Sequence, residues 1–327
     1  MSAGQITEFL LSDEWDAPFF KRLAHNDTGR AKGHQGGMFV PKDLRKFFPF
    51  LDLKQISVGS PTTDRPLRAE LYLGIRHVAD VVVRYQYQTW GATRVPESRI
   101  TDNLGPLRSV ASAGDLLVFQ RSSVSLDHFR LILIRRRSVA FKEINEYIRG
   151  RRWGSLFLDE QPVTEVELEQ ATLALDNLAN QPFLILKPNV TRVETRQMRI
   201  ARSSVFPKLI GKEYQTRCCV SGVLVATPTP LYEAQAAHIV PISEGGTDDI
   251  RNGLSLTRTL HWAFDQGLFG VLPNRRIYLP RRVRGMNTNS FLKQFRGHEI
   301  AEARTPKFRA HPDALAWHFK NRVTEWE

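Results

Sequence analysis

A chain of 327 residues is long enough for two domains with separate cores, because a single hydrophobic core rarely keeps growing to this length. Its 42% hydrophobic and 24% charged residues argue against long disorder, and no apolar run is long enough to span a membrane. The formal net charge of +12 favours a polyanionic partner, most simply nucleic acid, over a surface that is merely solvated.

The first 145 residues predict mainly β-structure. Alternating or apolar runs at 67–91, 114–123 and 127–141 are separated by clusters of turn-forming residues. One short helix is expected over 41–51, where Pro41 suits a first helical turn. This part of the chain therefore predicts a β-rich domain.

The next segment changes character. Thr164 and Glu167 form a capping-box pattern at the start of a helix that Pro182 ends. A basic stretch over 186–219 then predicts further helix. We expect a first domain over 1–150, a helical connector over 151–190 and a second domain over 191–327.

The two cysteines, Cys218 and Cys219, are adjacent. Vicinal cysteines rarely form a disulfide, and with no second pair they cannot build a cysteine-rich zinc ribbon. Together with an N-terminus that lacks a secretory pattern, they favour a reducing, cytoplasmic environment.

The stretch "AAHIVPISEGGTDDIRNGLSLTRTLHWAFDQGLF" over 236–269 carries the parts that phosphodiester hydrolysis needs. His238 can act as the base that deprotonates water, and Asn252 can hold the loop that carries it. His261 and Asp265 lie four residues apart on one predicted helical face, where an imidazole and a carboxylate can bind one cation. A complete set of roles at these spacings is far less common than any one histidine by itself.

These residues resemble the HNH endonuclease motif, from about Cys218 to Val271. The resemblance implies a ββα-metal fold in which His238 is the general base, Asn252 orients the loop, and His261 and Asp265 are the metal ligands. Magnesium or manganese is the expected metal, with nickel or zinc as alternatives.

Ala237 departs from this pattern, since many HNH nucleases have a metal-binding aspartate or histidine there, although the similar subgroup also has a small residue. The departure predicts a sparsely liganded metal site, which water and substrate phosphate would complete. Glu233 is a weaker candidate for a further oxygen ligand.

A basic run follows the catalytic stretch. Between Val271 and Ala310, ten basic residues stand against two acidic ones. Arg281, Arg282 and Arg284 are the expected contacts with DNA phosphates, although such a run can also be a solvated face.

Two polar stretches of the first domain suit recognition of base edges. "GHQGGMFVPK" and "TRVPESRIT" resemble, in order and spacing, the two arms of the EcoRII-type, B3-like DNA-binding domain, over residues 10 to 140. That resemblance implies a β pseudobarrel that grips the major groove. The expected DNA contacts in these arms are His34, Gln35, Phe39, Arg94, Glu97, Ser98 and Arg99. Phe39 stands where the family has a tyrosine, and "RVPES" is one residue longer, so the target sequence can differ.

The sequence thus predicts an α+β protein of two domains: a B3-like β pseudobarrel and a ββα-metal HNH nuclease with surrounding helices. The expected function is sequence-specific restriction of double-stranded DNA, with two protomers or two binding events for double-strand cleavage. A modification-dependent nuclease is the main alternative. A DNA-binding regulator with a vestigial nuclease domain, or an RNA-binding or anti-phage sensing module, would be different classes of protein.

Overall fold

The computed structural model describes residues 4–12, 14–30, 37–57, 59–90, 94–123, 125–187, 196–228 and 232–327. The chain divides into two compact units, one of Met1–Glu169 with Arg196–Ser204 and the other of Gln170–Thr195 with Val205–Glu327. Helices α4 (Glu165–Leu178) and α5 (Arg196–Glu213) each contribute to both units, because the division falls inside α4 after Glu169 and inside α5 after Ser204. The predicted functional boundaries near 150 and 190 stay a prediction.

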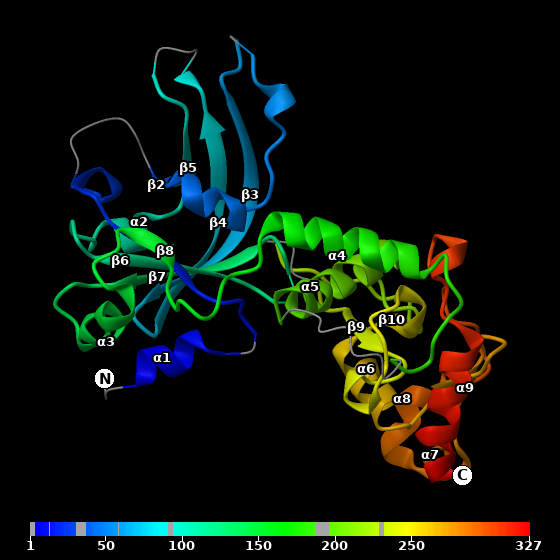
Figure 1. The fold of residues 1–327 in the computed structure, drawn as a ribbon. Helices are drawn as coiled ribbons and strands as arrows, with labels where there is room; N and C mark the ends of the chain where they lie inside the picture. Colours follow the sequence, from blue (N-terminus) through cyan, green and yellow to red (C-terminus); the bar gives the residue numbers. More distant parts are fainter. Residues whose placement is uncertain are drawn as a thin grey trace. The chain divides into compact units, whose positions relative to one another are not determined.

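The first unit is built on an eight-stranded sheet that curls into a half-barrel (Figure 1). Its strand order is β2-β5-β4-β3-β7-β6-β1-β8, and all neighbours are antiparallel except β3 and β7. The strands are β1 (Phe19–Arg22), β2 (Met38–Val40), β3 (Thr62–Leu73), β4 (Arg76–Gln88), β5 (Glu97–Thr101), β6 (Leu116–Arg121), β7 (His128–Ile134) and β8 (Trp153–Ser155). This β-rich unit confirms the predicted architecture of the first half of the chain.

Two hydrophobic cores lie on opposite faces of this sheet. Phe19, Phe119 and Phe129 pack in one core, whereas their strand neighbours Phe20 and Val118 pack in the other. Side chains alternate between the faces of a strand, so a strand covered on both faces is apolar throughout. Helices α1 (Gln5–Leu10) and α3 (Val139–Ile148) supply the second core (Figure 1).

Three local features differ from, or refine, the sequence-based expectation. The run 67–91 is a hairpin of β3 and β4 that turns at Gly74, whose φ of +62° favours glycine. The expected helix at 41–51 is the 3-10 helix η2 (Lys42–Phe47). Helix α3 was not predicted; it begins where the Ser138 side chain accepts a hydrogen bond from Phe141 N. Short helices η1 (His25–Asp27), η3 (Leu53–Gln55) and α2 (Gly105–Arg108) complete the unit.

The second unit contains the ββα arrangement that the motif predicts. Strand β9 (Gln235–His238) pairs antiparallel with β10 (Gly253–Leu256), and α6 (Arg258–Asp265) follows directly. The loop between the strands holds η5 (Ile242–Glu244) and η6 (Ile250–Asn252). The remaining elements are β11 (Gly270–Val271), β12 (Ile277–Tyr278), α7 (Arg281–Gly285), η7 (Asn287–Asn289), α8 (Ser290–Lys293), η8 (Pro306–Phe308), α9 (Pro312–Asn321) and η9 (Val323–Trp326).

The two units together confirm the predicted α+β class. Among the described residues, no helix is both long and apolar enough to cross a membrane.

Candidate active site

The hairpin and the helix of the second unit bring three of the predicted catalytic side chains to one cavity. His238 ends β9, while His261 and Asp265 are one helical turn apart on α6. All three line a cavity of about 620 Å³. These three residues, which are spread over 28 positions of the sequence, therefore lie together in the folded protein.

His261 and Asp265 form the pair that a cation can use. Their Nε2 and Oδ2 atoms are 3.5 Å apart, and the Asp265 side chain is about half exposed (47%). Burial raises the pKa of Asp265, and electrostatic interaction with His261 and then with His238 opposes that shift. Burial destabilises the ionised form of this carboxylate in the free protein, and a bound cation would stabilise that form.

The described residues contain no group of three or more histidine, cysteine, aspartate or glutamate side chains that could hold a metal ion. The protein donor set there is therefore one imidazole and one carboxylate, which fits a hydrated divalent cation that keeps open positions for water and phosphate. The sparse liganding expected from Ala237 stays a prediction.

Ala237 itself lies away from the cavity. Its side chain is fully buried, whereas its neighbours Ala236 and His238 line the cavity, as the alternation of a strand requires. Glu233, the weaker candidate ligand, accepts a hydrogen bond from Arg258 N at 2.7 Å and so holds the first turn of α6.

Asn252 joins the two ends of the loop between β9 and β10. It is fully buried, its Oδ1 accepts from Val240 N at 2.9 Å, and its Nδ2 donates to the carbonyls of Val240 and Thr247 at 3.0 and 2.8 Å. These bonds fix the chain on both sides of the loop, which is the geometry that a loop-orienting role requires.

Several neighbours of the site were not found from the sequence. Asp248 Oδ1 lies 3.2 Å from His238 Nε2, and the Phe206 ring stacks on the His238 ring at 4.0 Å and 6°. Gln235 Oε1 lies 3.2 Å from His261 Nδ1. The position of Asp248 just after a Gly-Gly turn is a signal that could have been used. Phe206, on α5, gives no such signal, since it is remote from the motif in sequence.

The recognition positions of the first unit differ in exposure. His34 and Gln35 lie outside the described residues. Arg94 is exposed, with its guanidinium 5.3 Å from the Trp90 ring. Phe39 is 36% exposed and pairs across the β2–β5 ladder with Arg99. The side chains of Arg94 and Phe39 are therefore accessible to a ligand without rearrangement.

The other three positions on β5 are less accessible. Ser98 is buried, and Arg99 and Glu97 bind each other through Nε and Oε1 at 2.7 Å, with exposed side-chain fractions of 9% and 19%. Because Glu97 and Arg99 pair with each other, they would have to exchange partners before contacting a base edge.

Phe39 is held by a buried ion pair. Lys21 and Asp27 are 2.8 Å apart, Phe39 N donates to Asp27 Oδ1 at 2.8 Å, and the Lys21 ammonium also donates to Phe39 O. Burial lowers the pKa of Lys21, and Asp27 opposes this. The backbone of Phe39 is thus fixed on both sides of its exposed ring.

Three of the basic residues after the motif, Arg281, Arg282 and Arg284, lie on α7. Arg281 and Arg282 are exposed and Arg284 is partly buried. The Arg282 guanidinium lies 5.8 Å from the Trp326 ring, and Trp326 also lines the cavity that contains His238, His261 and Asp265. Arg282 is thereby linked through one ring to the rim of the site.

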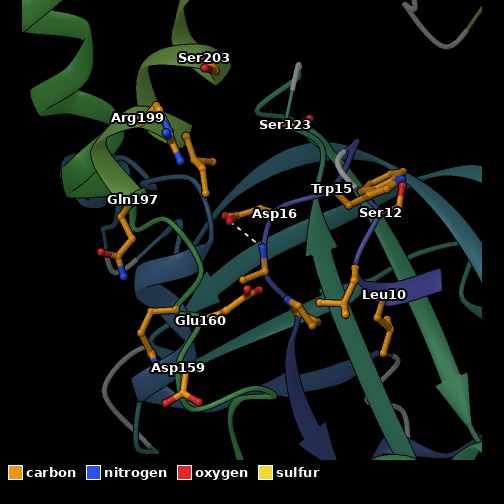
Figure 2. A pocket seen from close by; sticks show the side chains of 15 residues that line it. Leu10, Ser12, Trp15, Asp16, Ser123, Asp159, Glu160, Gln197, Arg199 and Ser203 are labelled. Carbon is orange, nitrogen blue, oxygen red and sulfur yellow. Dashed lines mark hydrogen bonds between the residues drawn. The ribbon is translucent and has the colours of Figure 1, made fainter. Parts of the chain in front are cut away.

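A second cavity, of about 490 Å³, lies in the first unit and is drawn in Figure 2. Asp16 lies at its wall, and its carboxylate accepts hydrogen bonds from Ala17 N and Val163 N at 2.7 and 2.8 Å. Burial raises the pKa of Asp16 to about 6. Both oxygens have protein partners, so this carboxylate does not indicate a ligand.

Comparison with known proteins agrees with the site. The family model described as HNH endonuclease matches residues 218–272. This stretch holds β9, β10 and α6 with all four motif residues, so the chain carries an HNH endonuclease domain.

Among solved structures, the chain is similar to a modification-dependent TagI restriction endonuclease (21% identity, TM-score 0.31), over 37% of this chain and 39% of that one. It is also similar to the B3 domain of the UbaLAI restriction endonuclease with cognate DNA (21% identity, TM-score 0.27), over 37% and 67%. The match thus spans about two fifths of the TagI enzyme. No curated protein matches the chain.

Proposed function

We propose that this chain is a divalent-metal-dependent DNA endonuclease of the restriction type, acting in the cytoplasm. In this proposal the first unit selects the DNA sequence and the second unit hydrolyses the backbone. The observation that carries it is the convergence of His238, His261 and Asp265 on one cavity within the HNH domain.

The protein side of the reaction follows from the geometry. His238 takes a proton from the attacking water, because a neutral imidazole is a base at physiological pH. Asn252 holds the loop, so that the imidazole stays in place during the reaction. Arg281 and Arg282 bind backbone phosphates near the cavity without reading sequence.

His261 and Asp265 would hold the divalent cation. When bound, the cation supplies positive charge that neutralises the phosphate under attack. Magnesium or manganese is the proposed ion, since two protein ligands with open positions suit a hard, hydrated cation.

The first unit is proposed to read sequence through the arms around residues 34–39 and 94–99. A curled sheet suits a B3-like reader, and Phe39 on β2 and Arg94 before β5 are the accessible positions among the described residues of the two arms. One HNH site cuts one strand, so cleavage of both strands requires two protomers or two binding events.

The test incubates the full chain with methylated and unmethylated plasmid in magnesium, manganese or EDTA. We expect metal-dependent cutting that His238→Ala abolishes and that the exposed control His298→Ala retains. Absence of metal-dependent cutting on every substrate would contradict the nuclease proposal. Comparing the two plasmids separates simple restriction from dependence on cytosine modification.

A second test addresses sequence selection. Arg94→Ala, Phe39→Ala and His34→Ala are expected to weaken or broaden site preference while non-specific cutting in manganese persists. If all three variants cut at the same sites with the same preference, the recognition arms are wrongly assigned.

A further inference from the structure

The base histidine of the site has an acidic partner across the turn. His238 Nε2 and Asp248 Oδ1 are 3.2 Å apart, and the exposed side-chain fractions are 24% for His238 and 9% for Asp248. We infer that Asp248 is a positioning residue that holds His238 in its Nε2–H tautomer and so reserves Nδ1 for the proton of the attacking water. This inference deepens the proposed function and rests on it for its catalytic part.

The chemistry of the two groups fixes the direction of the hydrogen bond. An ionised carboxylate can only accept, so the shared hydrogen belongs to His238 Nε2. In a neutral imidazole the other nitrogen then carries the lone pair. Within the described residues, Nδ1 of His238 has no hydrogen-bond partner, and the ring lines the cavity with His261 and Asp265. Nδ1 is therefore the atom available for proton transfer.

The loop is built to return Asp248 to His238. A Cβ at Gly246 would lie 2.1 Å from Val240 O, so the chain folds back more tightly there than any other residue allows. Asn252 Nδ2 holds the Thr247 carbonyl at 2.8 Å, immediately before Asp248. On the other side, Asp249 accepts from Arg251 N at 2.9 Å. The backbone is thus fixed on both sides of the carboxylate.

The ring plane is fixed independently. The Phe206 ring stacks on His238 at 4.0 Å between centroids and 6° between planes. Rotation about the side-chain bond would break this stack and the contact with Asp248 together. Two unrelated contacts therefore hold one ring orientation, as expected of a base that must be pre-organised.

The water oxygen forms a bond to phosphorus while its proton moves to Nδ1 of His238, and the P–O3′ bond breaks. The departing oxygen takes a proton from solvent. The imidazolium that forms has both nitrogens protonated, with Asp248 next to one of them, so the carboxylate stabilises the charge as it develops. Asp265 and His261 also face His238 across the cavity, but His261 is the closer partner of Asp265.

The first test is spectroscopic and needs neither metal nor DNA. Nitrogen chemical shifts of isotope-labelled histidine in the full chain report the His238 tautomer, with assignment by His238→Gln. We expect predominantly Nε2–H in the unchanged protein. Asp248→Asn, whose amide can donate to Nε2, should shift the population toward Nδ1–H, whereas Asp248→Glu should keep the original tautomer in part.

The second test is kinetic. Asp248→Asn is expected to lower kcat by about 100-fold or more, because the wrong tautomer cannot accept the proton, and to change KM for DNA by less than about threefold. The matched control is Asp249→Asn, which removes a neighbouring buried carboxylate that binds Arg251 instead. The asparagine keeps an oxygen that can accept from Arg251 N, so the turn beside Asp248 is retained. The variant should lower thermal stability through the lost ion pair and leave the His238 tautomer unchanged.

Three outcomes would overturn the inference. They are a predominantly Nδ1–H tautomer in the unchanged protein, an unchanged tautomer in Asp248→Asn, or full kcat in that variant. If Asp248→Asn does not fold, the His238 tautomer measured in the unchanged protein and in Asp248→Glu still tests the pairing of Asp248 with His238. If the unchanged protein cuts no DNA, the proposed function fails, while the spectra still establish or refute the pairing.

Discussion

Two buried side chains of the second unit stabilise the fold beside the proposed active site. Asn252 satisfies backbone groups at both ends of its loop, and His318 supports the helix that carries the proposed metal ligands. Its ring stacks on Phe264 at 3.6 Å, and its Nε2 lies 2.9 Å from Phe264 O. Because both side chains are buried, changes to them should appear in stability as well as in activity.

The first prediction concerns Asn252. Asn252→Ala leaves Val240 N and the Thr247 carbonyl without partners in a buried loop, so the free energy of unfolding of the second unit should fall by about 3 kcal/mol. Urea unfolding measures this, and the exposed Asn287→Ala is the control. Equal stability of the two variants would show that water replaces the lost hydrogen bonds.

The second prediction concerns pH. Burial lowers the pKa of His318 from an ordinary 6.5 to about 4, with its bond to Phe264 O opposing the shift. Between these values the unfolded chain binds a proton that the folded chain does not, so stability is lost as pH falls from about 6.5 to about 4. The loss is about 3 kcal/mol.

The measurement compares unfolding of the unchanged protein with His318→Phe, which keeps the ring but does not titrate. As pH falls through this window, the free energy of unfolding of the unchanged protein should fall relative to that of His318→Phe, whereas the exposed control His298→Gln should leave the pH dependence of the unchanged protein intact. A parallel pH dependence in His318→Phe would assign the acid sensitivity to other groups.

At the scale of elements, α6 and the β9–β10 hairpin place the site. Helical spacing alone puts His261 and Asp265 on one face, and α6 begins directly after β10. Helix α5 packs against the hairpin, where Phe206 and Ile210 approach Gly253 so closely that a Cβ there would lie 2.7 and 2.4 Å from them. The glycine of the motif is thus explained by packing.

The third prediction concerns the two proposed ligands on α6. His261→Ala and Asp265→Asn should each raise the magnesium concentration for half-maximal cleavage by more than about tenfold, since even outer contacts of a metal cost this much. Manganese binding measured by calorimetry in the presence of uncut DNA gives a second readout. The exposed Thr259→Ala on the same helix is the control, and equal metal dependence in all variants would place the cation elsewhere.

The fourth prediction concerns Gly253. Gly253→Ala should destabilise the second unit by about 1–3 kcal/mol, because the new methyl group displaces side chains of α5. It should also disturb the stack of Phe206 on His238 and lower kcat. Adding Ile210→Val removes the closest contact and should recover part of the stability in thermal unfolding.

Gly285→Ala is the matched control for this change, since a Cβ there meets only open space. If Gly253→Ala unfolds at the same temperature as Gly285→Ala, α5 is not held as tightly as the structure indicates.

At the scale of the whole molecule, the net charge of +12 would favour the proposed association with DNA by long-range attraction. Phosphate contacts release counterions, so affinity falls with salt in proportion to their number. The two units offer different clusters of exposed arginine, one on α7 and one after β7. Variants of the two clusters can therefore separate the effect of total charge on DNA binding from the effect of where the arginines lie.

The fifth prediction uses this difference. Replacing Arg281, Arg282 and Arg284 with alanine should reduce the slope of log K against log salt by up to about 3, because each phosphate contact contributes about 0.9. Replacing the exposed Arg135, Arg136 and Arg137 removes the same charge and is the control. DNA-binding titrations at several salt concentrations measure the two slopes. Identical slopes for the two triple variants would show that net charge, and not the position of the arginines on α7, sets the salt dependence.

The sequence by itself determined the local parts of this protein. Chain length and the change from β-like to helical patterns predicted two domains of α+β class, and the types and spacing of four residues predicted the catalytic stretch. The ββα order followed from the resemblance of that stretch to the HNH motif. Each depends on neighbours in the chain, so a pattern can show it. The hairpin at Gly74 and helix α3 were less clear, because long β-runs and strand exits do not mark their own turns.

Only the tertiary structure decided which side chains act on the base and which are hidden. It placed Phe206 and Asp248 against His238, turned Ala237 away from the cavity, and buried Ser98 in the sheet that was expected to present it. Such contacts depend on how a loop closes and how a helix approaches a strand. Those are set by packing and by backbone hydrogen bonds between residues distant in sequence, which spacing along the chain does not encode.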